Sequence, residues 1–258
     1  MRITKIEKKK RRYLMELDSD ERLYITEDTI IRFLLSKDKD LSDDQLLEIK
    51  SYNDFSYGKN LALYHLSFKQ RTAREVRDYL ESHDVPQATL SKIITHLKEE
   101  NWINDRKYVQ SIAESNLLSG NKGAFLLKQK LMQKGLAASL IDEELAAFDF
   151  SIVANRTAEK LIRSYQRKMP PKALKDKVIQ NLSQKGFSYR ESLDAFETVD
   201  FEEDQDQTSS LLEKEVEKIY RKYSKKYDGY ELRQRMTKAL ARKGFDFDDI
   251  ASTLRDYF

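Results

Sequence analysis

The side chains that could do acid–base or metal chemistry in this 258-residue chain are three histidines and several carboxylate clusters. None of His65, His83 and His96 has a second histidine at metal-ligand spacing, so each is expected to be an ordinary, partly exposed side chain. Neighbouring carboxylates, as in residues 142–144 and 202–206, are typical of solvated helix or loop surfaces. Together these residues predict no active site.

Other classes of chemistry are excluded by what the sequence lacks. It has no cysteine, which excludes disulfide bonds, thiolate catalysis and thiolate-bound metals. It also has no Walker-type phosphate loop, no glycine-rich nucleotide fingerprint and no nucleophile elbow. We therefore predict a binding protein that is not an enzyme and needs no cofactor. Without a signal peptide or an apolar run long enough to cross a bilayer, it is expected in the cytoplasm and away from membranes.

Lysine and arginine are the side chains left to carry binding, and they are unevenly distributed. Residues 1–12 carry seven basic side chains against one acidic, whereas residues 191–217 carry one against eleven. Blocks of opposite sign can steer a charged partner even when the net charge is only +3. Blocks of this kind are also typical of solvated helix faces, so charge alone does not choose between the two interpretations.

Basic residues at helical spacing are the candidate partner-binding residues. Arg74 and Arg77 are three positions apart and share a helix face, and the four basic residues from 156 to 167 follow at spacings of four, three and four. The full predicted set is Arg71, Arg74, Arg77, Lys128, Lys130, Lys134, Arg156, Lys160, Arg163 and Arg167. The competing interpretation is a solvated face, and Lys134 fits a third role, complementing the negative end of a helix. Trp102 and Tyr108 are predicted to be core residues.

A repeat of about fifty residues predicts the elements that position these side chains. Leu80, Leu131, Leu182 and Leu240 stand 51, 51 and 58 residues apart, and each has an apolar residue four positions before it. In the last three copies a lysine stands three positions after the leucine, and a glycine and an apolar residue follow it. This pattern predicts a helix that ends at a glycine in the left-handed conformation. Asp84 takes the glycine position in the first copy. Capping boxes are predicted at 72–75 and 188–191.

The predicted fold is mainly α, with tandem three-helix repeats in an extended, curved array. Short stretches rich in β-branched and aromatic residues near 2–7, 13–18 and 22–26 predict a small β-hairpin-like element, followed by helices near 27–35 and 42–53. The predicted boundaries are 1–56 for this N-terminal extension, 57–119, 120–168 and 169–227 for three repeats, and 228–258 for a partial fourth.

Three segments of the repeat region also resemble a known family. Residues 71–80 read RTAREVRDYL, residues 97–109 read LKEENWINDRKYV, and residues 131–136 read LMQKGL. In order and spacing they are similar to motifs of the RecX family of regulatory proteins. The resemblance covers about residues 57–257, and the segment before it resembles the extension of longer members from Gram-positive bacteria.

The resemblance implies a regulator of the RecA recombinase. Such a protein would bind the RecA nucleoprotein filament and mainly inhibit recombinase and coprotease activity in DNA repair and the SOS response. Separately from the resemblance, we expect a monomer that binds single- and double-stranded DNA weakly. Two features depart from the family pattern. Asn116 and Leu118 stand at positions where the linker between the first and second units often has basic side chains, and the chain continues past three units to a fourth. The alternative function is direct nucleic-acid binding, as a helical repeat or a helix-turn-helix-like transcription factor.

Overall fold

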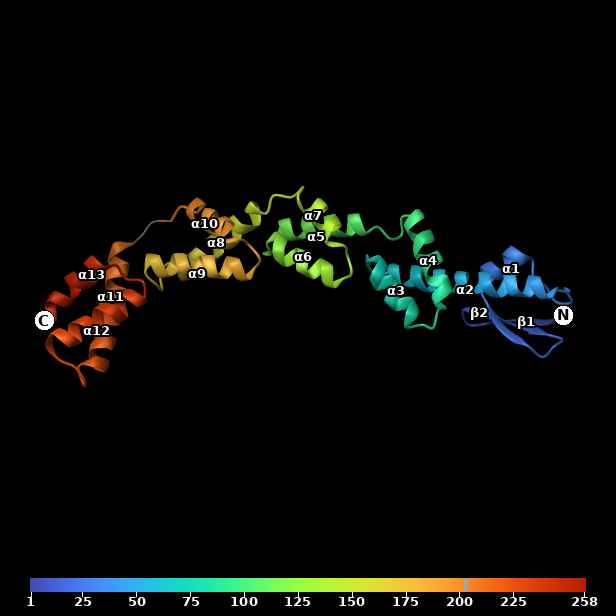
Figure 1. Ribbon diagram of the computed structural model, residues 1–258, viewed down its shortest axis with the longest axis horizontal. Coiled ribbons are helices and arrows are strands. Elements are labelled where there is room, and N and C mark those ends of the chain that lie inside the picture. The colour runs from blue at the N-terminus through green and yellow to red at the C-terminus, as the bar shows by residue number, and fades with distance from the viewer. Residues whose placement is uncertain (202–203) are drawn as a thin grey trace. The chain divides into compact units, whose positions relative to one another are not determined.

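The computed structural model describes residues 1–201 and 204–258 and divides the chain into two compact bodies. Met1–Ser111 with Leu131–Ile141 form the N-terminal body, and Ile112–Lys130 with Asp142–Phe258 form the C-terminal body. Figure 1 shows a small sheet at the N-terminus, followed by helices throughout the rest of the described chain. The prediction of a mainly α fold with tandem three-helix units is confirmed.

The N-terminal extension contains a three-stranded antiparallel sheet, one strand more than a hairpin. Strands β1 (Ile3–Lys9), β2 (Arg12–Leu17) and β3 (Arg22–Ile25) lie in the order β1-β2-β3. Helices α1 (Glu27–Phe33) and α2 (Asp43–Leu66) cover one face of the sheet. The shared core consists of Ile3, Met15, Leu17, Ile25, Leu35, Leu41, Leu46 and Ile49.

Helix α2 is longer than the sequence predicts, because long-range contacts hold a segment poor in helix formers. The side chain of Asn53 accepts from the amide of Thr26 at 2.9 Å and donates to the carbonyl of Tyr24 at 3.1 Å. Gly58 lies against the side chain of Ile93, where a Cβ atom would overlap it. These contacts override local propensity. The predicted boundary at residues 56 and 57 therefore falls inside one continuous helix.

The three-helix units after the first begin one helix earlier than the sequence-based boundaries place them. Helices α3 (Ala73–Glu81) and α4 (Gln87–Glu99) share a core with the second half of α2. The next group is α5 (Asp105–Ser119), α6 (Ala124–Gln133) and α7 (Ala138–Leu145). Within the C-terminal body, α8 (Ser151–Tyr165), α9 (Pro171–Gln184) and α10 (Tyr189–Thr198) pack on one another. The helix that the sequence analysis placed last in each repeat thus opens the next unit.

The last unit contains three α-helices instead of the predicted two. Helices α11 (Gln205–Tyr223), α12 (Gly229–Arg242) and α13 (Phe247–Thr253) enclose a core of Leu212, Val216, Ile219, Leu232, Met236, Leu240, Phe245, Ile250 and Leu254. A short 3-10 turn, Leu254–Asp256, follows α13. The acidic run at 202–206 lies partly outside the described residues, since 202 and 203 are not among them.

The helix ends follow the predicted chemistry closely. Gly135, Gly186 and Gly244 have φ of +85°, +90° and +89°, and Asp84 has φ of +57°. After each of these residues the next amide donates back to the repeat leucine, as Phe187 does to the carbonyl of Leu182 at 3.2 Å. Both predicted capping boxes are formed. The residues that end these helices are therefore part of the sequence repeat itself.

Candidate partner-binding surfaces

The Lys-Gly turns of the repeat lie where one three-helix unit meets the next. A Cβ atom at Gly135 would overlap the side chain of Arg74 on α3. At Gly186 it would stand 2.5 Å from the backbone nitrogen of Leu126 on α6, and at Gly244 it would stand 2.8 Å from that of Ala173 on α9. Each glycine thus meets the first turns of the second helix in the preceding unit. The absence of a side chain permits both the backbone conformation and the contact.

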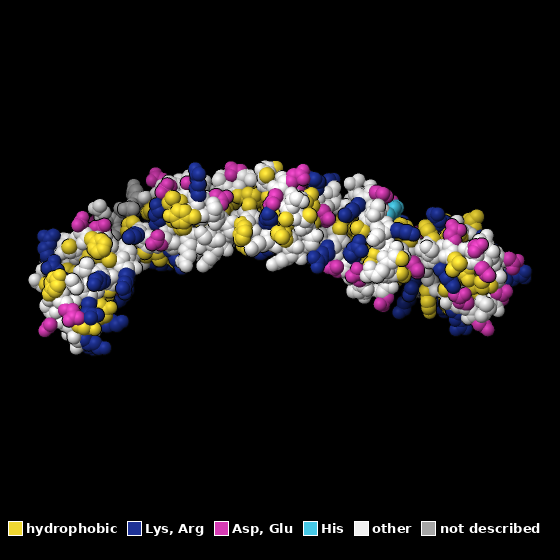
Figure 2. Space-filling view, in the orientation of Figure 1, with side chains coloured by type: hydrophobic (Ala, Val, Ile, Leu, Met, Phe, Trp, Pro, Cys, Tyr) yellow, Lys and Arg dark blue, Asp and Glu magenta, His cyan; other side chains and the backbone are white. Residues whose placement is uncertain are grey.

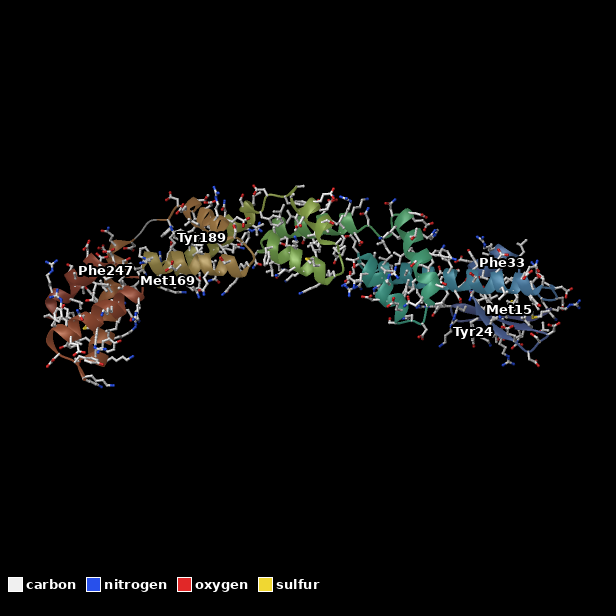
Figure 3. All side chains as sticks on the ribbon, in the orientation of Figure 1. Met15, Tyr24, Phe33, Met169, Tyr189 and Phe247 are labelled. Atoms are coloured by element: carbon white, nitrogen blue, oxygen red, sulfur yellow. The ribbon has the colours of Figure 1, made fainter. Side chains whose placement is uncertain are left out.

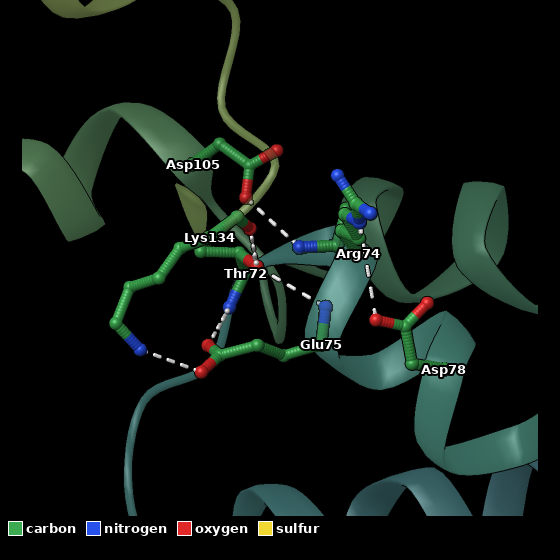
Figure 4. Close-up of polar contacts among 7 residues, drawn as sticks. Thr72, Arg74, Glu75, Asp78, Asp105 and Lys134 are labelled. Atoms are coloured by element: carbon green, nitrogen blue, oxygen red, sulfur yellow. Dashed lines mark hydrogen bonds and ion pairs between the residues drawn. The ribbon is translucent and has the colours of Figure 1, made fainter. Parts of the chain in front are cut away.

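A hydrogen-bonded network fixes the first of these junctions (Figure 4). The hydroxyl of Thr72 donates to the carbonyl of Lys134 at 2.9 Å, and the Lys134 ammonium binds the Glu75 carboxylate at 2.6 Å. Glu75 also accepts from the amide of Thr72 at 3.0 Å, and Asp105 accepts from the amide of Ala73 at 3.0 Å. These bonds satisfy the otherwise unpaired amides at the start of α3.

Charges in this network are matched to one another. The hydrogen bond to Glu75 raises the pKa of Lys134. Burial acts to raise the pKa of Glu75, but the hydrogen bonds from Lys134 and Thr72 outweigh it and leave that pKa below its usual value. Lys134 is therefore bound by a carboxylate of its own chain. This agrees with the prediction of a structural role for Lys134, although the partner is a side chain and not the negative end of a helix.

Arg156 on α8 closes the end of α5. Its guanidinium donates to the carbonyls of Leu117 at 2.7 Å and Gly120 at 2.8 Å, and to two further carbonyls, of Asn116 and Leu118. Three of these carbonyls belong to the last turn of α5, where a helix leaves carbonyl groups without intrahelical partners, although that of Asn116 also accepts from the amide of Gly120 at 2.9 Å. Arg156 therefore holds two neighbouring units together.

The two linker residues that depart from the family pattern lie in different environments. Asn116 is buried; its side chain donates to the carbonyl of Lys122 at 2.8 Å and accepts from the amide of Lys122 at 3.1 Å. Leu118, by contrast, is 82% exposed. The linker is thus a closed turn, and it presents an apolar side chain at a position where related proteins often have lysine or arginine.

The ten predicted binding residues fall into two groups. Five are engaged within the chain: Arg156 at the carbonyls of α5, Arg74 with Asp78, Lys128 with Asp142, Lys134 with Glu75 and Arg163 with Glu159. Figure 2 shows how acidic and basic side chains intermingle on the surface. The other five have no carboxylate partner among the described residues: Arg71, Arg77, Lys130, Lys160 and Arg167. The predicted stripe from 156 to 167 is therefore not uniformly available.

Lys130 belongs to a lysine cluster in the C-terminal body that the sequence does not reveal. Proximity to Lys130, burial and the charge of Lys185 all lower the pKa of Lys122. None of the three has a carboxylate partner within residues 1–201 and 204–258. Like charges held close together without a counter-ion form a local site of high positive potential. We call Lys122, Lys130 and Lys185 the lysine cluster.

A second cationic region in the extension was also missed. Residues 8–12 line a cavity of about 790 Å³ together with tyrosines of β3 and α2. The sequence signal was present, because residues 1–12 carry an excess of six positive charges. The tyrosines are distant in sequence, so nothing in the local pattern connected them with these cations.

The histidines and aromatic residues are mostly structural. The His65 ring stacks on Tyr79 with a centroid distance of 3.8 Å. Among the described residues no group of side chains could hold a metal ion. Tyr108 is buried as predicted, but Trp102 is 55% exposed, so its prediction as a core residue was wrong. Asn101 at φ +60° turns the chain so that Ile103 fills the core position instead.

Among the helices that the structure describes, none is long and apolar enough to cross a membrane.

Comparison with known proteins gives the family. Residues 59–97, 104–145 and 205–254 match the models of the first, second and third three-helix domains of RecX. The chain is 60% identical to "Regulatory protein RecX" of Streptococcus sanguinis (strain SK36) and 59% identical to that of Streptococcus gordonii (strain Challis), covering 100% of both chains in each case. Helices α8–α10 lie between the second and third matched segments, so the unit beyond three is internal, whereas the sequence analysis placed it at the end.

Solved structures agree with this assignment. A crystal structure of regulatory protein RecX superposes with a TM-score of 0.60 and 30% identity, covering 76% of this chain and 97% of the other. A crystal structure of RecX from Lactobacillus salivarius superposes with a TM-score of 0.54 and 30% identity, covering 57% of this chain and 96% of the other. The chain, with its three matched domains and its full-length relatives, therefore belongs to the RecX family of regulatory proteins.

Proposed function

We propose that this protein binds the RecA–DNA filament and mainly restrains its recombinase and coprotease activities, as a monomer and without catalysis of its own. The observation that carries the proposal is identity of 56–60% over the full length with proteins named "Regulatory protein RecX". Family resemblance implies RecA as the regulated partner. Action in the cytoplasm belongs to the same proposal, because the filament forms on chromosomal DNA.

The distribution of unpaired cations supports a polyanionic partner. Lys130 and the rest of the lysine cluster lie in the C-terminal body, and Arg71 and Arg77 lie in the N-terminal body, so each body carries basic side chains without local carboxylate partners among its described residues. Phosphates of filament-bound DNA, or acidic side chains of the filament protein, would provide the missing counter-charges.

Co-sedimentation tests the proposal directly. The full chain is centrifuged with preformed RecA–single-stranded-DNA filaments, with RecA alone and with DNA alone. We expect it to pellet with filaments at concentrations where DNA alone retains little of it. In parallel, RecA-dependent ATP hydrolysis and strand exchange should fall when the protein is added at or below the RecA concentration.

Two outcomes would contradict the proposal. Unchanged strand exchange and ATP hydrolysis at equimolar protein would remove RecA as the regulated partner. Tight, sequence-specific binding to duplex DNA without RecA would favour the transcription-factor alternative.

A further inference from the structure

The turn between β1 and β2 places five consecutive cations, Lys8 to Arg12, beside a row of tyrosines. Tyr24 comes from β3, while Tyr57 and Tyr64 come from α2. Together with Thr26, Asn60 and Leu61, these residues line the cavity of about 790 Å³. The cavity lies wholly within the N-terminal body, and no carboxylate lines it.

Guanidinium groups and aromatic rings alternate along this cavity. Arg12 lies over Tyr57 at 4.7 Å from the ring centroid and over Tyr24 at 5.0 Å, and Arg11 lies over Tyr64 at 4.9 Å. As whole residues, Tyr24 and Tyr64 are 51% and 47% exposed (Figure 3 labels Tyr24), and Phe68 packs against the Tyr64 ring in a T-shaped contact with a centroid distance of 5.0 Å. Flat groups arranged in this way form a platform on which further flat groups can stack.

The nearby acids are occupied elsewhere. Glu7 binds both Lys5 and Lys9, which hold its pKa at about 2. Asp28 accepts hydrogen bonds from Ser56 at 3.0 Å and Asn60 at 3.2 Å. Lys8, Lys10, Arg11 and Arg12 have no carboxylate partner in the part of the chain that the structure describes.

The turn itself favours a functional role for its cations. Lys10 has φ of +47°, a conformation that glycine or asparagine adopts more readily than lysine. A strained residue at an exposed turn, beside an open cavity, is an observation from which function can be inferred.

We propose that this cavity is a binding site for single-stranded nucleic acid. Lys8, Lys10 and Arg11 bind backbone phosphates, and bases stack on the open faces of Tyr24 and Tyr64. A single strand fits better than a duplex because its bases can leave their own stack, and better than an acidic peptide because a peptide would leave the aromatic faces unused. The inference goes beyond the proposed function, since it requires no RecA.

Fluorescence anisotropy of a labelled oligo-dT strand, with the full chain and without RecA, tests the site. Replacing Tyr24→Ala and Tyr64→Ala together should weaken binding at least about fivefold for each ring lost. Tyr24→Phe with Tyr64→Phe should bind as the parent does, because stacking needs the ring and not the hydroxyl. The matched control removes two exposed tyrosines of the C-terminal body, Tyr189→Ala and Tyr230→Ala, and should bind normally. Circular dichroism verifies that each variant is folded.

A charge series separates the phosphate contacts from the stacking contacts. Lys10→Gln with Arg11→Gln should reduce the slope of log affinity against log salt by about 1.4, whereas Lys225→Gln with Lys226→Gln should leave it unchanged. Equal losses in the two pairs, or alanine variants at the tyrosines that bind as the parent does, would overturn the site. Competition by polyglutamate as effective as by oligo-dT would assign the cavity to acidic peptides instead. None of these results depends on filament binding, which is measured with RecA.

Discussion

Two kinds of turn in this protein combine a lysine with a residue at positive φ, and they differ in which residue adopts that conformation. At the unit junctions glycine does so, directly after Lys134, Lys185 or Lys243, and a neighbouring helix packs against it. At the β1–β2 turn Lys10 itself does so, and its side chain borders an open cavity. Glycine stands where packing leaves no room, whereas lysine stands where the side chain is available for a partner.

The comparison extends to the cations themselves. At two of the junctions the lysine is bound by a carboxylate of its own chain, Lys134 by Glu75 and Lys243 by Glu215. The cations of the β1–β2 turn and the lysine cluster have no such partner among the described residues. Sequence spacing alone cannot show which cations are paired within the chain and which are not, because both groups contain the same residue types. The separation comes from the carboxylates and carbonyls that folding brings near.

The largest expected effect is at a junction glycine. Gly186→Ala forces a side chain into the positive-φ conformation and against the backbone of α6, 2.5 Å from the Leu126 nitrogen, and should destabilise the fold by about 3 kcal/mol. Gly229→Ala is the matched control, because φ is +45° there but no atom lies within 4 Å of the added Cβ; its cost should be about 1 kcal/mol. Urea unfolding followed by circular dichroism measures both. Equal costs would show that the junction contact contributes nothing.

The next effect concerns the cation with the most carbonyl partners. Arg156→Leu removes the donor to the carbonyls of Leu117 and Gly120 and should cost about 2 kcal/mol in unfolding free energy. Arg156→Lys should recover only part of this, because one ammonium cannot reproduce the fork of guanidinium donors. Lys160→Gln, on the same helix but unpaired, should change stability by less than about 0.5 kcal/mol. Filament binding by the folded Arg156→Lys variant should match that of the parent. A loss of binding without a loss of stability would show that Arg156 contacts the filament directly.

Local rules explain what the sequence predicted well. The repeat leucines, the left-handed glycines and both capping boxes depend on residues within about one helical turn of each other, so the sequence displays them directly. The existence of the three-helix units followed from these patterns, and the small sheet followed from equally local stretches rich in β-branched and aromatic residues.

Long-range contacts explain what the sequence did not show. The length of α2 depends on Asn53 reaching Thr26, and the role of Arg156 depends on carbonyls at residues 116–120. The unit boundaries shifted by one helix because a repeat period fixes spacing but not which three helices pack together. Likewise, the tyrosine-lined cavity depends on two rings of α2 lying beside a turn about fifty residues earlier in the chain.

A neighbouring pair of lysines gives a finer test of the division between engaged and unpaired cations. Lys128 binds Asp142 at 2.6 Å, whereas Lys130, two residues later, belongs to the lysine cluster. If Lys130 contacts a phosphate of the filament, Lys130→Gln should weaken filament binding about fourfold at physiological salt and reduce the salt slope by about one. Lys128→Gln should change neither quantity beyond experimental error. Co-sedimentation at several salt concentrations measures both, and equal losses would mean that pairing does not decide which cations bind.

The smallest expected effect returns to the β1–β2 turn and has opposite signs for stability and binding. Lys10→Gly relieves a side chain at positive φ but makes the unfolded chain more flexible, so the net change should be a stabilisation of about 0.5 kcal/mol. The same substitution removes one cation from the cavity and should lower the salt slope of oligo-dT binding by about 0.7. Lys10→Asn is the control, since it removes the charge while keeping a side chain that tolerates the turn, and it should lower the slope equally. If Lys10→Gly were both less stable and unchanged in binding, the lysine would be at this turn for packing, and the contrast with the junction glycines would be lost.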